Sequence, residues 1–124
     1  MPGLLLVMIG GAVGSALRWE TSRLALRRLG PGFPWGTLAV NLIGALLMGM
    51  LAARIIEAGT DRPLWLLLAV GLLGGFTTFS AFSLELFLML QRGEAGFAAG
   101  YAAASVAGSV LLVAIGYCAV RAAA

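Results

Sequence analysis

Charged residues are scarce in this chain. Only 10% of its 124 residues are Asp, Glu, Lys or Arg, and there is no Lys and no His, so the formal net charge of +3 rests on arginine alone. The arginines are scattered and form no basic stripe, which excludes a nucleic-acid-binding surface and favours lipid headgroups as their partners.

The chain has little cysteine, and its start does not have the pattern of a secretory signal. Cys118 is the only cysteine, so a disulfide framework within one chain is excluded, and we interpret it as a small buried hydrophobe. Met1-Pro2-Gly3 places no charged region before the first apolar run. We therefore expect that run to stay in the mature protein rather than to be removed as a signal.

Apolar residues make up most of the chain, at 61% of the total with a mean hydropathy of +1.03. A helix that spans a bilayer needs about 20 apolar residues. The chain divides into four such spans, over about residues 4–29, 35–56, 63–90 and 95–120, and leaves no room for a soluble domain. The predicted fold is one all-α transmembrane domain.

The third predicted span contains a run that plain hydrocarbon packing does not need. From Gly74 to Ser83 it reads Gly-Gly-Phe-Thr-Thr-Phe-Ser-Ala-Phe-Ser, with paired glycines and four hydroxyls at membrane depth. Glycines followed by β-branched threonines weaken a helix. We expect the third helix to be interrupted here, as happens at membrane depth where protein or water covers the freed backbone, often at an ion site.

Three polar residues elsewhere in the apolar spans each allow two interpretations. Asn41 bridges two helices or donates its N–H to an anion in a pore. Arg18 snorkels to the interface or lines a polar vestibule that attracts an anion. Glu85 pairs with an arginine near the membrane face, or it is a functional intramembrane carboxylate.

Two further patterns favour a path for a small anion. Phe79 and Phe82 are helical neighbours among hydroxyls, and an aromatic ring carries positive potential at its edge. In the fourth span, Tyr101, Ser105 and Ser109 recur at steps of four, either bonding to their own helix or forming a polar track. A stripe of small residues beside them predicts a tight packing face: Gly96, Gly100, Ala104 and Gly108.

The arginines barely distinguish the two membrane faces. One face would hold Arg54, Arg62 and Arg121, and the other would hold Arg23, Arg27, Arg28 and Arg92, with Arg18 as a possible fifth. The positive-inside rule then gives almost no orientation. We therefore expect two copies to insert in opposite directions and form an antiparallel, dual-topology homodimer.

Taken together, these motifs resemble the Fluc (CrcB) fluoride channel family over all four spans. The resemblance rests on Gly36-Thr37-Leu38 followed by Asn41, on the block from Gly74 to Ser83 with Glu85, on Arg18-Trp19, and on the stretch from Tyr101 to Ser109. Ala81 departs from the pattern, since many members carry Thr there. The resemblance implies a passive channel, and no enzyme, that exports fluoride across the bacterial inner membrane.

The resemblance also implies particular roles. The carbonyls of Gly74 and Thr77 would hold a structural sodium ion at the centre of the dimer. The implied anion pathway comprises Arg18, Asn41, Thr78, Phe79, Ser80, Phe82, Glu85, Tyr101, Ser105 and Ser109. The residues alone indicate a narrow path for a small anion, and fluoride comes from the resemblance.

Two other function classes are less well supported by the sequence. A small multidrug-resistance-type exporter couples transport to protons through an acid in its first span, but Leu4 to Leu17 contains none. A membrane scaffold that transports nothing would not need Asn41 or a hydroxyl-lined break.

Overall fold

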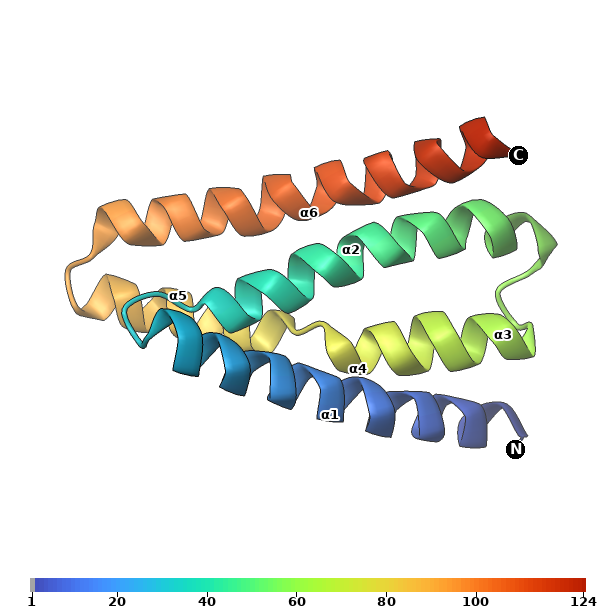
Figure 1. The fold of residues 1–124 in the computed structure, drawn as a ribbon, viewed down its shortest axis with the longest axis horizontal. Helices are drawn as coiled ribbons and strands as arrows, with labels where there is room; N and C mark the ends of the chain where they lie inside the picture. The colour runs from blue at the N-terminus through green and yellow to red at the C-terminus, as the bar shows by residue number, and fades with distance from the viewer. Residues whose placement is uncertain (1) are drawn as a thin grey trace.

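The computed structural model describes residues 2–124, and this part of the chain contains helices and no strand (Figure 1). In chain order the elements are α1 (Pro2–Leu29), α2 (Trp35–Ile55), the 3-10 turn η1 (Ile56–Ala58), α3 (Pro63–Trp65), the π-helical segment η2 (Leu66–Leu73), α4 (Gly74–Phe76), α5 (Phe79–Gln91) and α6 (Ala95–Ala123). Four stretches are long and apolar enough to cross a membrane: Pro2–Leu29, Trp35–Ala58, Pro63–Gln91 and Ala95–Ala123. The predicted all-α fold with four potential spans is confirmed.

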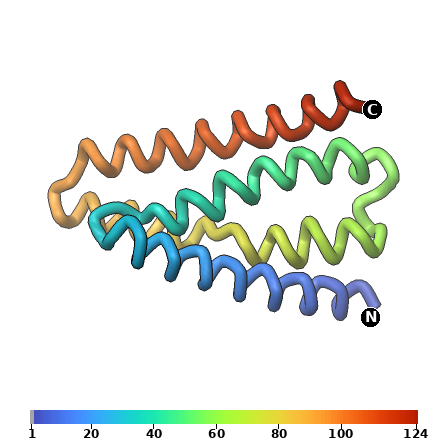
Figure 2. Tube along the Cα trace, in the orientation of Figure 1, coloured from blue at the N-terminus to red at the C-terminus, as the bar shows by residue number. Residues whose placement is uncertain are grey.

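The four stretches run up and down beside one another (Figure 2). Both chain ends and the connection between α2 and α3 lie at one end of the bundle, and the other two connections lie at the opposite end. α6 packs mainly on α2, and α1 packs mainly on η2 and also on α2 and α4. The third stretch is therefore held between α1 and the rest of the bundle.

The two connections at one end are short turns that each contain a glycine with positive φ. Gly30 and Gly93 follow α1 and α5 with φ of +77° and +76°, the left-handed conformation that commonly ends a helix. Arg92 Nε then donates to Glu94 Oε1 at 2.9 Å, just before α6 begins. This hydrogen bond lowers the pKa of the Glu94 carboxyl below its usual value.

The third stretch changes helix type before it breaks. It starts at Pro63, the position where a missing N–H costs nothing, and becomes π-helical over Leu66–Leu73. Runs of π-helix are rare and often mark functional sites. The sequence pattern did not predict this segment, because its run of leucines fits either helix type.

Glycines allow the close packing of α1 against this stretch. A Cβ on Gly10 would lie 2.8 Å from Leu72 N, and a Cβ on Gly75 would lie 2.6 Å from Gly11 O. A Cβ on Gly14 would lie 2.8 Å from Phe76 N. The spacing of Gly10 and Gly14 therefore serves close backbone contact, as small residues four apart do in membrane helices.

Two packing expectations for the fourth span are wrong for the single chain. Nothing lies within 4 Å of a Cβ placed on Gly96 or Gly100, whereas one on Gly108 meets Leu42 at 3.0 Å and one on Gly116 meets the Leu46 carbonyl. The packing face of α6 thus begins later than its sequence stripe. Cys118 is exposed rather than buried.

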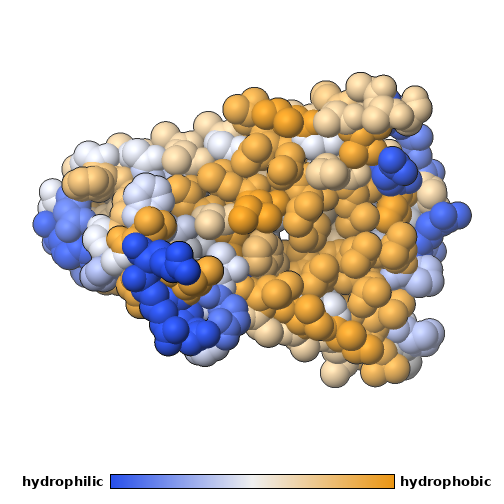
Figure 3. Space-filling view, viewed as in Figure 1, coloured by the Kyte–Doolittle hydropathy of each residue, from blue (hydrophilic) through white to orange (hydrophobic). Residues whose placement is uncertain are grey.

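The outer surface is largely apolar (Figure 3). Hydrophobic side chains cover the middle of the face shown, and hydrophilic ones gather at both ends. Large exposed side chains include Leu4, Met8 and Leu17 on α1 and Phe97, Val110 and Leu111 on α6. This distribution is that of a multi-pass membrane protein, whose sides face lipid or other apolar partners.

Candidate functional site

The third stretch is interrupted at two residues only. Gly74–Phe76 is helical, and the break consists of Thr77 (φ −87°, ψ 158°) and Thr78 (φ −152°, ψ 122°), both extended. The predicted interruption is present, but it is narrower than the run from Gly74 to Ser83. The β-branched threonines depart from helical geometry, and the glycines before them do not.

Asn41 on α2 binds the extended backbone at both of its polar ends. Its Nδ2 donates to Thr78 O at 3.0 Å, and its Oδ1 accepts from Thr78 N at 2.8 Å. The bond to Oδ1 replaces the one that Thr78 N–H would make to Gly74 O in a continuous helix. The bond from Nδ2 is additional, because Thr78 is the N-cap residue of α5, whose carbonyl accepts the first bond of that helix. Of the two interpretations of Asn41, the structure shows the bridge between helices, and the second N–H of the amide is left for another acceptor.

The backbone carbonyls from Gly74 to Thr77 lose their helical donors at the break, and two of those donors bind elsewhere. In a continuous α-helix, Thr78 N–H would bond Gly74 O and Ala81 N–H would bond Thr77 O. Thr78 N–H instead reaches Asn41, and Ala81 N–H donates to Thr78 Oγ1 at 3.2 Å, which caps α5. The carbonyls of Gly74 and Thr77 are thus available to a ligand, and carbonyl oxygens suit a hard cation.

Arg18 reaches the same break from α1. Its Nε donates to Gly75 O at 3.0 Å, and its side chain is partly buried. The interpretation that Arg18 snorkels outward is therefore not what the structure shows. Its guanidinium borders a cavity and holds positive charge there.

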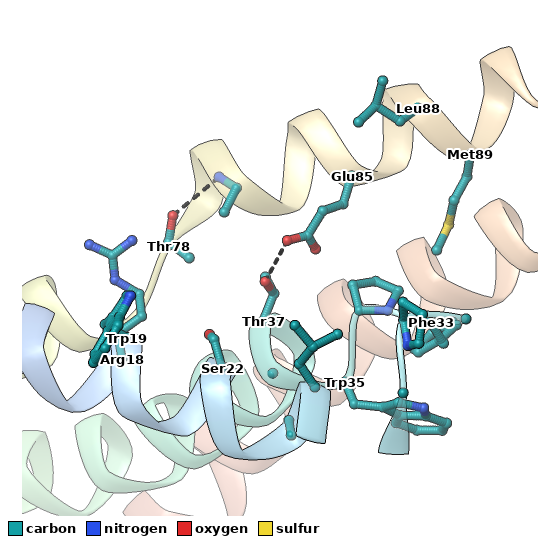
Figure 4. Close-up of a pocket in the computed structure, with 18 of the residues that line it drawn as sticks. Arg18, Trp19, Ser22, Phe33, Trp35, Thr37, Thr78, Glu85, Leu88 and Met89 are labelled. Atoms are coloured by element: carbon teal, nitrogen blue, oxygen red, sulfur yellow. Dashed lines mark hydrogen bonds between the residues drawn. The ribbon is translucent and has the colours of Figure 1, made fainter. Parts of the chain in front are cut away.

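Glu85 is held by two hydroxyls. Thr37 Oγ1 donates to Glu85 Oε1 at 2.7 Å (Figure 4). Tyr101 OH donates to Glu85 Oε2, also at 2.7 Å. Among residues 2–124, the structure records no ion pair between Glu85 and an arginine. Of the two interpretations of Glu85, pairing with an arginine is not what the structure shows, and the sequence did not indicate Thr37 as its partner.

A cavity of about 570 Å³ lies between α1, α2 and α5, where Figure 4 shows Arg18, Thr37, Thr78 and Glu85 around it. Its remaining wall includes further α1 residues such as Trp19 and Ser22, residues of the first connection, and Leu88, Met89 and Arg92. The Arg18 guanidinium, the Glu85 carboxylate and the hydroxyls of Thr37 and Thr78 therefore line one cavity.

A second cavity, of about 390 Å³, lies on the other side of Thr78. It is bordered by Asn41, Thr77, Thr78, Phe79, Phe82, Ser105 and Ser109 among others. Within residues 2–124, Ser105 Oγ is buried without a hydrogen-bond partner. Its hydroxyl is therefore free to bind something that enters this cavity.

The two phenylalanines have different environments. Their ring centroids are 5.6 Å apart, but Phe82 is 6% exposed and Phe79 is 76% exposed. Phe82 also contacts Tyr101 edge-on, with centroids 5.1 Å apart. Phe82 is fixed by this packing, whereas Phe79 projects away from its own chain.

The structure brings most of the predicted residues to these two cavities. Ser80 lies at the edge, with its Oγ 3.3 Å from Thr78 Oγ1. Tyr101 lines neither cavity directly and joins them through Glu85 and Phe82. Gly75 was missed by sequence reasoning, and nothing in the paired glycines indicated which carbonyl Arg18 would take.

The fold and site define a class: a four-span membrane protein with a broken helix and polar cavities on either side of the break. Comparison with known proteins narrows this class. The model of the family described as "CrcB-like protein, Camphor Resistance (CrcB)" matches residues 5–117. The chain belongs to the CrcB family.

Three relatives resemble almost the whole chain, and each is named "Fluoride-specific ion channel FluC". The protein from Novosphingobium aromaticivorans is 53% identical over 112 residues, covering 89% of each chain. The one from Sphingopyxis alaskensis is 45% identical over 122 residues, covering 98% of this chain and 97% of the relative. The one from Mesorhizobium japonicum is 44% identical over 116 residues, covering 94% of each.

Proposed function

We propose that this protein is a fluoride-specific ion channel that lets fluoride leave the cell passively and so lowers its cytoplasmic concentration. The observation that carries this proposal is the likeness over 89% or more of the chain to relatives named as fluoride channels. The two cavities on either side of Thr78 are consistent with it.

The arrangement of donors suits a small, strongly hydrated anion. A conducting path must replace water by several weak partners without one strong trap. We propose that fluoride is attracted by Arg18 and passes Thr78, Ser80, Glu85 and Tyr101 by way of the hydroxyls. Beyond the break, the path continues along Asn41, Ser105, Ser109 and the ring edges of Phe79 and Phe82.

The active unit in this proposal is an antiparallel homodimer in the bacterial inner membrane. The exposure of Phe79 supports it, since a second copy would cover this ring and complete the pathway. A structural sodium ion would lie at the centre, held by the carbonyls of Gly74 and Thr77 from both copies. When bound, the ion would supply a fixed charge that holds the two breaks together.

The test is efflux of fluoride and chloride from liposomes that contain purified protein and potassium fluoride or potassium chloride, measured with ion-selective electrodes. A passive fluoride channel separates charge, so fluoride efflux should need valinomycin to carry compensating potassium. Chloride should stay inside. Equal chloride efflux would contradict selectivity. Fluoride efflux without valinomycin would show electroneutral transport, as when fluoride and a proton move together, and would contradict a passive channel.

A further inference from the structure

The break in the third stretch leaves more backbone groups without a helical partner than the side chains of Thr77 and Thr78 can bond. In a continuous α-helix, Phe79 N–H would donate to Gly75 O. Here Arg18 Nε donates to that carbonyl at 3.0 Å from a residue 57 positions earlier in the chain. Arg18 therefore stands in for a missing helical donor.

The carbonyls around the break have different partners. Leu73 O accepts from Thr77 N at 3.0 Å and from Thr77 Oγ1 at 2.8 Å, and Thr78 O accepts from Asn41. Gly75 O accepts from Arg18. The helical donors of Gly74 O and Thr77 O bind Asn41 Oδ1 and Thr78 Oγ1 instead. Phe76 O, between Gly75 and Thr77, also loses its helical donor at the break.

We propose that Arg18 is a positioning residue for the cation site: by binding Gly75 O it fixes the end of the helix so that Gly74 O and Thr77 O remain directed at the ion. This inference rests on the cation site in the proposed function. Arg18, which borders the first cavity, would then have two roles: it attracts the anion, and it holds the backbone of the cation site.

The packing around Arg18 makes this role possible. Gly11 and Gly14 allow α1 to approach the break so closely that a Cβ on Gly75 would lie 2.6 Å from Gly11 O. A Cβ on Gly14 would lie 2.8 Å from Phe76 N. The backbone of α1 is thus fixed against the break one turn before Arg18, and its side chain reaches a defined carbonyl.

The charge of Arg18 and its hydrogen bond to Gly75 O should have opposite effects on sodium binding, and this makes the proposal testable. A guanidinium near a bound cation repels it, so removing the charge alone would strengthen sodium binding. Removing the hydrogen bond would weaken sodium binding, because Gly75 O would lose its partner and the helix end would relax. The sign of the effect shows which term dominates.

Two variants separate these terms. Arg18→Gln places an amide nitrogen at the position of Nε and removes the charge, while Arg18→Met has the same reach with neither donor nor charge. Arg27→Met is the matched control, because Arg27 is an exposed arginine further along α1. The measurement is thermal unfolding of the purified, detergent-solubilised protein as NaCl replaces N-methylglucamine chloride at constant ionic strength.

We expect sodium to raise the unfolding temperature of the unsubstituted protein and of Arg27→Met over the same range of sodium concentration. In Arg18→Gln the rise should occur over a similar or lower range. Arg18→Met should need about tenfold more sodium for the same rise. Unchanged or tighter sodium dependence in Arg18→Met would overturn the proposal. So would weakening in Arg18→Gln equal to that in Arg18→Met.

The outcomes also distinguish this inference from the proposed function. If the unsubstituted protein showed no sodium dependence, the cation site itself would be wrong and the role of Arg18 with it, while fluoride efflux would test the channel independently. If Arg18→Met did not fold, the proposal would still be supported by an unfolding temperature that depends on sodium in Arg18→Gln and does not in Arg18→Ala. An unfolding temperature that does not depend on sodium in Arg18→Gln would contradict the proposal.

Discussion

The hydroxyl groups in these helices are of two kinds: some bond their own helix and others bond a neighbouring helix. Thr21 Oγ1 and Ser83 Oγ bond carbonyls four residues earlier in their own chain, at 2.8 Å and 2.9 Å. Thr37 and Tyr101 instead reach across to Glu85. Only the second kind ties one helix to another, so substitutions should separate the two kinds.

Tyr101 offers a matched test of this difference. Tyr101→Phe removes the donor to Glu85 Oε2 and leaves a partly buried carboxylate oxygen without that partner. We expect this change to lower the free energy of unfolding by about 1–3 kcal/mol and to slow fluoride efflux. Tyr117→Phe is the control, since its ring contact with Arg121 survives loss of the hydroxyl. Equal effects of the two changes would contradict the role of Glu85 and Tyr101.

Asn41 and Phe82 allow a second prediction at this scale. In the unsubstituted protein, Asn41 Nδ2 donates to Thr78 O at 3.0 Å. Asn41→Asp replaces this nitrogen with an oxygen that repels Thr78 O, and it puts a negative charge beside the cavity. Phe82→Ile keeps bulk but loses the positive ring edge. We expect each change to lower fluoride efflux at least about tenfold with the assembly intact.

Ser83→Ala is the control for both, because Ser83 bonds only its own helix among the described residues. Efflux at the unsubstituted rate in correctly assembled Asn41→Asp and Phe82→Ile would mean that both residues serve packing alone.

Residue types could be predicted from the sequence, but their partners could not. A polar side chain in an apolar span costs free energy unless it is paired, so Arg18, Asn41 and Glu85 could be identified from the sequence as residues that need partners. Which partner each takes depends on the relative rotation and depth of the helices. For this reason the bond from Thr37 to Glu85 and the bond from Arg18 to Gly75 emerged only in three dimensions.

Helices and their packing were predictable to different degrees. Four apolar stretches of spanning length leave little choice of fold, and β-branched threonines after paired glycines locate the break within a few residues. The π-helical segment η2 was not predictable, because its run of leucines fits an α-helix as well as a π-helix. Likewise, the stripe on α6 gave the kind of contact but not where it begins.

The contact between α1 and η2 gives a prediction at the scale of elements. Gly10→Ala would place a methyl group 2.8 Å from Leu72 N and 3.0 Å from Gly71 Cα, so η2 must move away. We expect a loss of about 1–3 kcal/mol in stability. At the adjacent residue, Gly11→Ala meets Gly71 O only at 3.9 Å and should be close to neutral.

Resistance to denaturation in mixed micelles of increasing sodium dodecyl sulfate content measures both glycine variants. Destabilisation of Gly11→Ala as large as that of Gly10→Ala would contradict this prediction: Ala is the better helix former at both positions, so the difference in contact with η2 would not determine the loss.

The molecule as a whole shows little charge difference between its two ends. Arg121 is paired with Glu57 at 2.8 Å at the end that holds the chain termini, and Arg92 is paired with Glu94 at the other. Arg23 is also paired, with Glu20 at 2.7 Å. Pairing thus removes one arginine at the first end and two at the other, and leaves Arg54 and Arg62 against Arg27 and Arg28. The bias remains weak, which favours insertion in both directions.

Orientation can be read from single cysteines placed at opposite ends. In a Cys118→Ala background, Gly32→Cys and Ala124→Cys introduce thiols at exposed positions in the first connection and at the C-terminus. An antiparallel dimer puts one copy of each thiol on each side of the membrane. A membrane-impermeant maleimide added to sealed vesicles should therefore label about half of each variant, and all of each after detergent is added. Full labelling of one variant and none of the other would show a single orientation, and the second half of the pathway could not then come from an inverted copy.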